Sequence, residues 1–297
     1  MSKVERRQSK QDEETYRKGM LVMVGTPLGN REDLSPRARR AITQANLLLC
    51  EDTRSPIRLL GEDIKLPQRL SCFAGNEGER VGIMLQHLTA GQTVAFISEA
   101  GMPIVSDPGR ILVRAAVDEG FEVDVVPGPS ASVSALCISG FAAKGFRFLG
   151  FLPRSGTERK ELLAGLQYAQ EPTIFYEAGN RVAKLLSDML EWVSGAGSRN
   201  IVIARELTKL HQEIIRGTIA DVYHRVYSEG GLRGEVTMIL EGRYEIEKFE
   251  QTRAASQAIE LMLDPKLKPR ERARKLASLS GINARELYQR LQNMKLQ

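Results

Sequence analysis

The chain has 297 residues, of which 42% are hydrophobic and 27% charged, a composition typical of globular proteins. This length predicts two domains with sizeable cores and leaves room for an appendage. The sequence has no uninterrupted apolar run long enough to cross a bilayer, and the polar N-terminal segment 1–19 lacks the apolar centre of a signal peptide. We therefore expect a cytoplasmic protein with no membrane partner and a frayed N-terminal tail.

The net charge of +5 is distributed unevenly along the chain. Residues 264–297 contain nine Lys or Arg and three Asp or Glu, so this segment alone carries +6. A basic terminal module suggests a polyanionic partner such as nucleic acid. A solvated helical face is the plainer alternative.

Cysteine and histidine residues are few and share no metal-ligand spacing. We expect reduced, mostly buried thiols and no bound metal. The residues concerned are Cys50, Cys72, Cys137, His87, His211 and His224.

The first half of the chain alternates short apolar segments with helical patterns. Ser35 and Pro36 suit the start of the first helix, as its cap and its first residue. Alternating strands and helices predict a mostly parallel sheet with helices on both faces. We expect strands at 20–25, 46–51, 94–97 and 121–126, an apolar segment at 66–73, and helices after residue 35, around 81–88, around 111–116 and after residue 131.

The pattern shifts at 146–153, where we place the connection to a second α/β domain. This domain has expected strands at 173–176, 201–204 and 234–240 and a helix through 182–189. Beyond residue 244 only helices are expected, near 258–262 and at 270–279 and 284–291, with a turn at Gly281. The last two resemble a small nucleic-acid-binding module, although a helical cap or a dimer contact remains open. The predicted domains are a tail at 1–19, α/β domains at 20–145 and 146–245, and a basic helical module at 246–297.

Four strands are followed by polar or glycine-rich loops, at 26–30, 51–54, 99–109 and 127–131. If the loops meet at one edge of a sheet, they form a cleft with many backbone amides and few side-chain nucleophiles. The chain has no GxxxxGK[ST] loop, no GxSxG elbow and no metal triad. These features argue against nucleotide hydrolysis and acyl transfer and favour a reaction in which a bound cofactor carries the reactive group.

Eight motifs occur in the order, and at about the spacing, of the tetrapyrrole-methylase superfamily: VGTPLGN, CEDTR, FISEAGMPIVSDPG, VVPGPSA, FLGFLPR, FYEAGNR, ARELTK and RGEVTMILEG. In detail they resemble its ribosomal RNA branch, the small-subunit rRNA methyltransferase I family. The resemblance covers residue 20 to about residue 242, and the C-terminal helices are similar to that family's additional domain.

The resemblance implies two α/β domains with S-adenosylmethionine in the cleft between them, a homodimer, and 2′-O-methylation of a cytidine ribose near the decoding centre. The substrate would be the 16S rRNA or the assembled small subunit. The implied cofactor-binding residues are Thr26, Pro27, Leu28, Gly101, Met102, Pro103, Val105, Ser130, Ala131, Ala204 and Leu207. The implied substrate-binding residues are Asn30, Arg54, Arg181, Arg205 and Glu206.

A ribose hydroxyl is a poor nucleophile until its proton is accepted, so polar side chains near the cleft are candidates for a catalytic role. We name Glu99, Asp52 and Lys209. Asp52 and Glu99 have an alternative structural role in capping a helix or pairing with a neighbouring arginine.

Two other functions remain open: methylation of a small tetrapyrrole, and RNA binding without catalysis by a protein of the same fold. The second is prompted by departures from the family pattern. Glu99 stands where the family usually has aspartate, and Phe73, Gly75 and Asn180 stand at or near positions where it usually has histidine.

Overall fold

The computed structural model describes residues 19–141, 144–243, 257, 261–262, 267–280 and 283–293. They form two compact units. One contains both β-sheets, and the other comprises Phe141–Phe146, Tyr168–Thr173 and the described part of Glu241–Gln297. None of the described helices is both long and apolar enough to cross a membrane. The predicted tail, apart from Gly19, and the predicted turn at Gly281 lie outside the described residues.

The first sheet has five strands in the order β3-β2-β4-β1-β5, and every neighbouring pair is parallel. This confirms the parallel sheet expected from the alternating pattern. Its strands are β1 (Met20–Val24), β2 (Leu47–Cys50), β3 (Gln68–Ser71), β4 (Thr93–Ile97) and β5 (Glu122–Val126). Its helices are α2 (Pro36–Gln44), α3 (Ser55–Leu60), α4 (Glu77–Thr89) and α5 (Arg110–Asp118), with the short 3-10 helix η1 (Arg31–Asp33) before α2.

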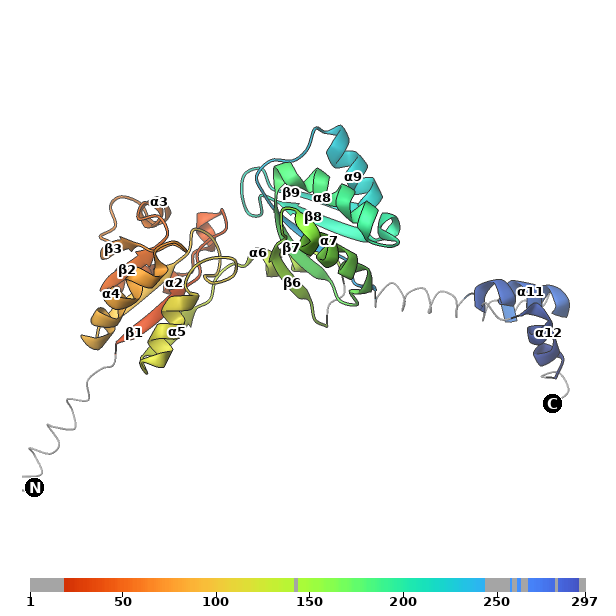
Figure 1. Ribbon diagram of the computed structural model, residues 1–297, viewed down its shortest axis with the longest axis horizontal. Coiled ribbons are helices and arrows are strands. Elements are labelled where there is room, and N and C mark those ends of the chain that lie inside the picture. Colours follow the sequence, from red (N-terminus) through yellow and green to blue (C-terminus); the bar gives the residue numbers. More distant parts are fainter. Residues whose placement is uncertain are drawn as a thin grey trace, which may run out of the picture. The chain divides into compact units, whose positions relative to one another are not determined.

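Both faces of this sheet are covered because side chains alternate along each strand. In β1, Leu21 and Met23 belong to a core shared with α4 and α5. Val22 and Val24 belong to a second core, shared with α2 and α3. Figure 1 shows these helices beside the strands. The α2 helix begins as expected, with the Ser35 hydroxyl accepting a hydrogen bond from the amide of Ala38 (3.0 Å).

The second sheet has the order β6-β7-β10-β8-β9, and β8 runs antiparallel to both β10 and β9. Its strands are β6 (Arg147–Phe151), β7 (Thr173–Ala178), β8 (Asn200–Arg205), β9 (Glu213–Thr218) and β10 (Glu235–Leu240). Its helices are α7 (Gly156–Gly165), α8 (Gly179–Trp192) and α9 (Ile219–Ser228), with 3-10 turns η2 (Leu166–Tyr168) and η3 (Ala196–Ser198).

One face of the second sheet packs on α7, α8 and α9 through a continuous apolar core that includes Leu163, Leu185 and Val222. The helix that follows β5 in the sequence, α6 (Ala131–Ser139), contacts β10 of this second sheet. The α6 segment therefore joins the first sheet to the second, and the loop before it is held at both ends.

The described elements that were not expected from the sequence include α3, β6, α7, β9 and α9. The segment at which we place the inter-domain connection contains strand β6. The two expected C-terminal helices are present as α11 (Pro269–Ser280) and α12 (Ala284–Asn293), and they contact each other. The helix expected near 258–262 falls largely outside the described residues.

Candidate active site

The loops that follow β1, β2, β4 and β5 meet at the carboxyl edge of the parallel sheet, as expected for strands that run in one direction. Thr26 and Gly101 form an isolated antiparallel bridge, with N···O distances of 2.9 and 3.1 Å. Gly25 and Gly128 approach closely, because a Cβ on Gly128 would lie 2.8 Å from the carbonyl carbon of Gly25. The loops after β1, β4 and β5 therefore touch through backbone.

These loops border a pocket of about 360 Å³. This volume is within the range of roughly 300 to 1,000 Å³ that is typical of small-molecule sites. Residues of the second sheet and its loops complete the lining, including Tyr176, Ala204 and Thr237.

Most of the residues expected to hold a cofactor line this pocket. Those lining it are Leu28, Gly101, Met102, Val105, Ser130, Ala131, Ala204 and Leu207. Thr26, Pro27 and Pro103 are buried and do not line it. Thr26 nevertheless fixes the lining loop through its bridge to Gly101. The cofactor contacts of these residues remain predictions.

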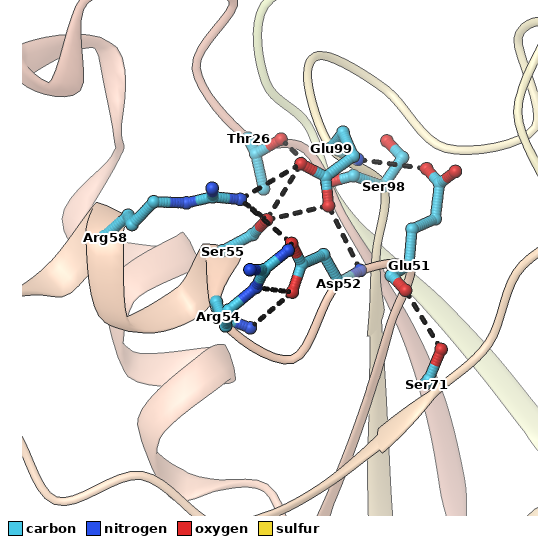
Figure 2. Close-up of polar contacts among 9 residues, drawn as sticks. All are labelled: Thr26, Glu51, Asp52, Arg54, Ser55, Arg58, Ser71, Ser98 and Glu99. Atoms are coloured by element: carbon cyan, nitrogen blue, oxygen red, sulfur yellow. Dashed lines mark hydrogen bonds and ion pairs between the residues drawn. The ribbon is translucent and has the colours of Figure 1, made fainter.

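Of the three proposed catalytic residues, Glu99 and Lys209 line the pocket and Asp52 does not. Figure 2 shows the Glu99 carboxylate surrounded by donors. The Ser55 hydroxyl lies 2.7 and 2.8 Å from its two oxygens, and the Asp52 amide donates to Oε1 over 3.1 Å. The Arg58 guanidinium lies 3.6 Å from Oε2. The Glu99 carboxylate is therefore held in place at the pocket wall.

The Asp52 carboxylate is turned towards arginines (Figure 2). It accepts hydrogen bonds from Arg54 at 2.8 Å and Arg58 at 3.3 Å. The hydrogen bonds from Arg54 lower the pKa of Asp52 to about 2, so this carboxylate is ionised at neutral pH and is a weak base. The contact of Asp52 with a lining residue is the hydrogen bond that its backbone amide donates to Glu99.

Lys209 lies between two carboxylates. Its Nζ is 3.1 Å from Glu206 Oε1 and 2.8 Å from Glu235 Oε2. Burial lowers the pKa of Lys209, but the hydrogen bonds to Glu235 and Glu206 outweigh it, and the net shift is upward. Lys209 is therefore a cation at the pocket wall. Its loop is strained, because Glu206 and Thr208 have φ values of 50° and 64°.

None of the five proposed substrate-binding residues lines the pocket. Arg181 pairs with the lining residue Glu177, and Glu206 pairs with the lining Lys209. The amide of Asn30 donates to Thr208 Oγ1 (3.2 Å). The remaining two are Arg54, paired with Asp52, and Arg205, which follows Ala204 and pairs with Glu213. Substrate contact by these residues stays a prediction.

Asp107 lines the pocket, although the sequence pattern placed it only in the polar loop 99–109. Burial, followed by the nearby charge of Glu51, raises the pKa of Asp107 to about 6. Tyr176 also lines the pocket, and burial raises its pKa as well. The raised pKa of Asp107 depends on groups from other strands, so no local sequence pattern could have revealed it.

Glu77 was also missed, and it holds the loop that carries Asp107. Its buried Oε1 accepts hydrogen bonds from the amides of Gly109 (3.0 Å), Ile111 (2.7 Å) and Leu112 (3.3 Å). These amides belong to the loop end and the first turn of α5, whose donors have no partner within the helix. Glu77 thus fixes one side of the pocket from another helix.

Comparison with known proteins defines the class first. A family model described as Tetrapyrrole (Corrin/Porphyrin) Methylases matches residues 20–223, more than half of the chain. The solved structure of the methyltransferase CobJ has a TM-score of 0.56 and 15% identity, covering 75% of this chain and 94% of that one. Uroporphyrin-III C-methyl transferase from Thermus thermophilus, complexed with S-adenyl homocysteine, has a TM-score of 0.53 and 18% identity, with coverage of 75% and 92%. These two likenesses establish the fold.

Curated relatives narrow the class. Ribosomal RNA small subunit methyltransferase I of Thermotoga maritima is 43% identical over 76% of this chain and 99% of its own length. The protein of the same name from Xylella fastidiosa is 37% identical over 91% and 98%, and that from Halalkalibacterium halodurans is 35% identical over 91% and 94%. The chain belongs to the ribosomal RNA small subunit methyltransferase I family of the tetrapyrrole methylases. The predictions of the family, of a methyltransferase and of S-adenosylmethionine as its cofactor are confirmed.

The pocket suits this cofactor. Gly101 has φ +80°, and a Cβ on it would lie 3.1 Å from Leu28 Cδ2 and 3.3 Å from Pro129 O, so this loop presents bare backbone. Leu28, Met102 and Leu207 supply apolar wall. Four carboxylates and one ammonium group line the pocket, an excess of negative charge that favours a sulfonium cation. They are Glu99, Asp107, Glu177, Glu235 and Lys209.

Proposed function

We propose that this protein transfers the methyl group of S-adenosylmethionine to the 2′-oxygen of a cytidine ribose in small-subunit (16S) rRNA, near the decoding centre. The observation that carries the proposal is the 37% identity, over 91% of this chain and 98% of the relative, to a protein named ribosomal RNA small subunit methyltransferase I. The pocket agrees with this proposal, because a direct methyl transfer needs a cofactor site and no side-chain nucleophile.

The cofactor, when bound, supplies a methyl group on a positively charged sulfur. The protein's part is to align an acceptor oxygen with that methyl carbon and to exclude water. The backbone bridge between Thr26 and Gly101 fixes the loops that form one wall. The Lys209 ion pairs with Glu206 and Glu235 fix the loop after β8.

The substrate is the rRNA itself or the assembled small subunit. The proposed rRNA contacts are Asn30, Arg54, Arg181, Arg205 and Glu206. Arginines are suited to this role because their planar guanidinium groups bind phosphate oxygens in pairs. The basic C-terminal module adds a second, sequence-independent contact with the phosphate backbone.

We further propose that the protein works in the cytoplasm as a homodimer. Exposed apolar side chains on β5 and α6 support the dimer: Val125 is 45% exposed, Val133 47% and Ile138 37%. We assign these side chains to the dimer interface, where a second copy of the chain would remove them from water. Sedimentation equilibrium of the wild type and of Val133→Glu tests it, because the proposal predicts a dimer for the first and a monomer for the second.

Incubation of the purified protein with methyl-labelled S-adenosylmethionine tests the function. The substrates compared are small subunits, naked 16S rRNA and uroporphyrinogen. Label on rRNA, recovered as 2′-O-methylcytidine after nuclease digestion, is the expected result. Label on the tetrapyrrole alone would contradict the proposal, and so would absence of label from every substrate while a homologous enzyme labels rRNA in parallel.

A further inference from the structure

The loop between β4 and α5 holds Asp107 in a strained arrangement at the pocket. Ile104 and Ser106 have φ values of 74° and 69°. A β-branched residue at positive φ is a conformational outlier. Such residues persist where surrounding contacts fix the backbone, and they cluster at functional sites. Here the amide of Ile104 donates to the carbonyl of Pro108 over 3.2 Å, and Glu77 holds the amide of Gly109.

The other three pocket carboxylates are committed to donors. Glu99 receives the Ser55 hydroxyl and the Asp52 amide. Glu177 pairs with Arg181, and its Oε1 accepts the Ala178 amide over 2.8 Å. Glu235 pairs with Lys209 at 2.8 Å. Each of these three carboxylates therefore already has a protein hydrogen-bond donor or cation at its oxygens.

Among the described residues, no cation influences the ionisation of Asp107. A hydrogen bond with the Ser98 hydroxyl lowers its pKa, but by less than burial and the charge of Glu51 raise it. The charged groups that face it are the carboxylates of Glu51, Glu235 and Glu99, and Tyr176 is close enough for Asp107 to influence its ionisation. These groups come from the ends of β2, β10, β4 and β7. Burial and like charges both favour the protonated form of Asp107.

We propose that Asp107 accepts the proton of the ribose hydroxyl that becomes methylated, an inference that rests on the function proposed above. A bond forms between the 2′-oxygen and the methyl carbon, while the carbon–sulfur bond breaks and its electron pair stays on sulfur. The electron pair of the O–H bond stays on oxygen, and the proton passes to a carboxylate oxygen of Asp107. Solvent removes it after the product leaves.

The ionisation of the neighbouring groups agrees with this assignment. The pKa of Asp107, raised by burial to about 6, makes it a stronger base than an ordinary aspartate and leaves it ionised at pH 7 to 8. Lys209 is protonated, because its hydrogen bonds to Glu235 and Glu206 raise its pKa despite burial. Burial raises the pKa of Tyr176, so its phenol is neutral and is no base at neutral pH.

A titration without cofactor or substrate tests the ionisation directly. The full-length protein is labelled at aspartate side-chain carboxyl carbons and followed by ¹³C NMR from pH 3 to 9. One resonance should titrate near pH 6 and should be missing from Asp107→Asn. It should remain in Asp118→Asn, which removes an exposed carboxylate of α5 that pairs with Arg114. An Asp107 resonance that titrates near pH 4 would overturn the inference.

Single-turnover methyl transfer to small-subunit rRNA tests the catalytic role. In the wild type we expect the rate to rise about tenfold per pH unit below pH 6 and then level off. In Asp107→Asn the rate of methyl transfer should fall about 10²- to 10⁴-fold and should no longer depend on pH. Its affinity for the cofactor, measured by calorimetry, should stay within about tenfold of the wild-type value. Asp107→Glu should recover part of the rate, and Glu99→Gln should keep the inflection.

The two ways of failing can be told apart. A wild-type protein that methylates rRNA while Asp107→Asn keeps its rate and inflection overturns the inference alone. A wild-type protein that leaves rRNA unmethylated overturns the proposed function, and the inference falls with it. If Asp107→Asn does not fold, the pH profile of Asp107→Glu and the wild-type titration still test whether Asp107 accepts the proton.

Discussion

At the scale of single residues, Glu77 holds the loop and helix end beside the pocket. Its buried carboxylate binds three amides at the start of α5. We expect Glu77→Ala to lower the free energy of unfolding by about 2 to 4 kcal/mol, because a hydrogen bond to a charged group contributes about 1.5 to 3 kcal/mol. Urea denaturation measures this change.

The matched control is Glu79→Ala, in the same helix, where the side chain is 76% exposed. Its effect should stay within about 0.5 kcal/mol, as for most surface substitutions. Equal effects of the two variants would contradict the role assigned to Glu77.

Asp107 should lower the stability of the folded protein by an amount that depends on pH. Its folded-state pKa is raised from 3.8 to about 6, so the native state binds the proton more tightly than the unfolded state does. Ionisation therefore destabilises the native protein progressively as the pH rises from about 4 to about 6. Asp107→Asn should raise Tm at pH 8, and the gain should shrink as the pH falls towards 4. Differential scanning fluorimetry across this range checks it, and a gain that grew towards low pH would refute the assignment.

At the scale of elements, contact between loop backbones shapes the pocket. A Cβ on Gly128 would meet three backbone atoms of Gly25 at 2.8 to 3.0 Å. Gly128→Ala should push the loops after β1 and β5 apart. We expect at least about tenfold weaker cofactor binding by calorimetry, since overpacking costs about 1 to 3 kcal/mol. Gly78→Ala in α4, where a Cβ meets nothing within 4 Å, should bind normally. Unchanged affinity of Gly128→Ala would show that the loops adapt.

Elements with a strong apolar pattern were predictable. The strands β2 and β4 are apolar runs that are almost entirely buried, and α2 has the expected Ser35 cap. The α9 helix was missed although Thr218 Oγ1 accepts the amide of Asp221, a capping pattern that the sequence contains. The α3 helix has six residues, too short for its periodicity to be recognised.

Only part of the pocket lining was predictable from the sequence. The resemblance supplied eight of the lining residues, and the need for a polar side chain near the ribose hydroxyl supplied two more, Glu99 and Lys209. Asp107 and Glu77 were not predicted, because the groups that define their roles are distant in the sequence. Glu77 binds an amide 32 residues later, and Asp107 is influenced by Glu51 and Glu235. Such roles arise from tertiary packing and have no local signal.

At the scale of the whole molecule, binding of rRNA should depend on the basic C-terminal helices. Lys268, Arg274 and Arg285 are exposed in or beside α11 and α12. Reversing all three to Glu should weaken rRNA binding and reduce the slope of log K against log salt by about one per lost phosphate contact. Cofactor affinity should not change. Fluorescence anisotropy at several salt concentrations measures the effect.

An equal change in net charge elsewhere is the control for that experiment. Arg39, Arg40 and Lys65 are exposed in the first α/β region, and their reversal to Glu alters the net charge by the same amount. A loss of rRNA affinity of the same size in both triple variants would mean that overall charge, rather than the C-terminal module, attracts the RNA.

Ribose methylation of the small-subunit rRNA is the central claim, and it can be read from the rRNA of the organism itself. Mapping of 2′-O-methyl positions in 16S rRNA, with and without the gene for this protein, compares the two directly. We predict that one 2′-O-methylcytidine near the decoding centre disappears with the gene and returns when the wild-type gene, but not Asp107→Asn, is restored. An identical 2′-O-methylation map in the presence and absence of the gene would contradict the account.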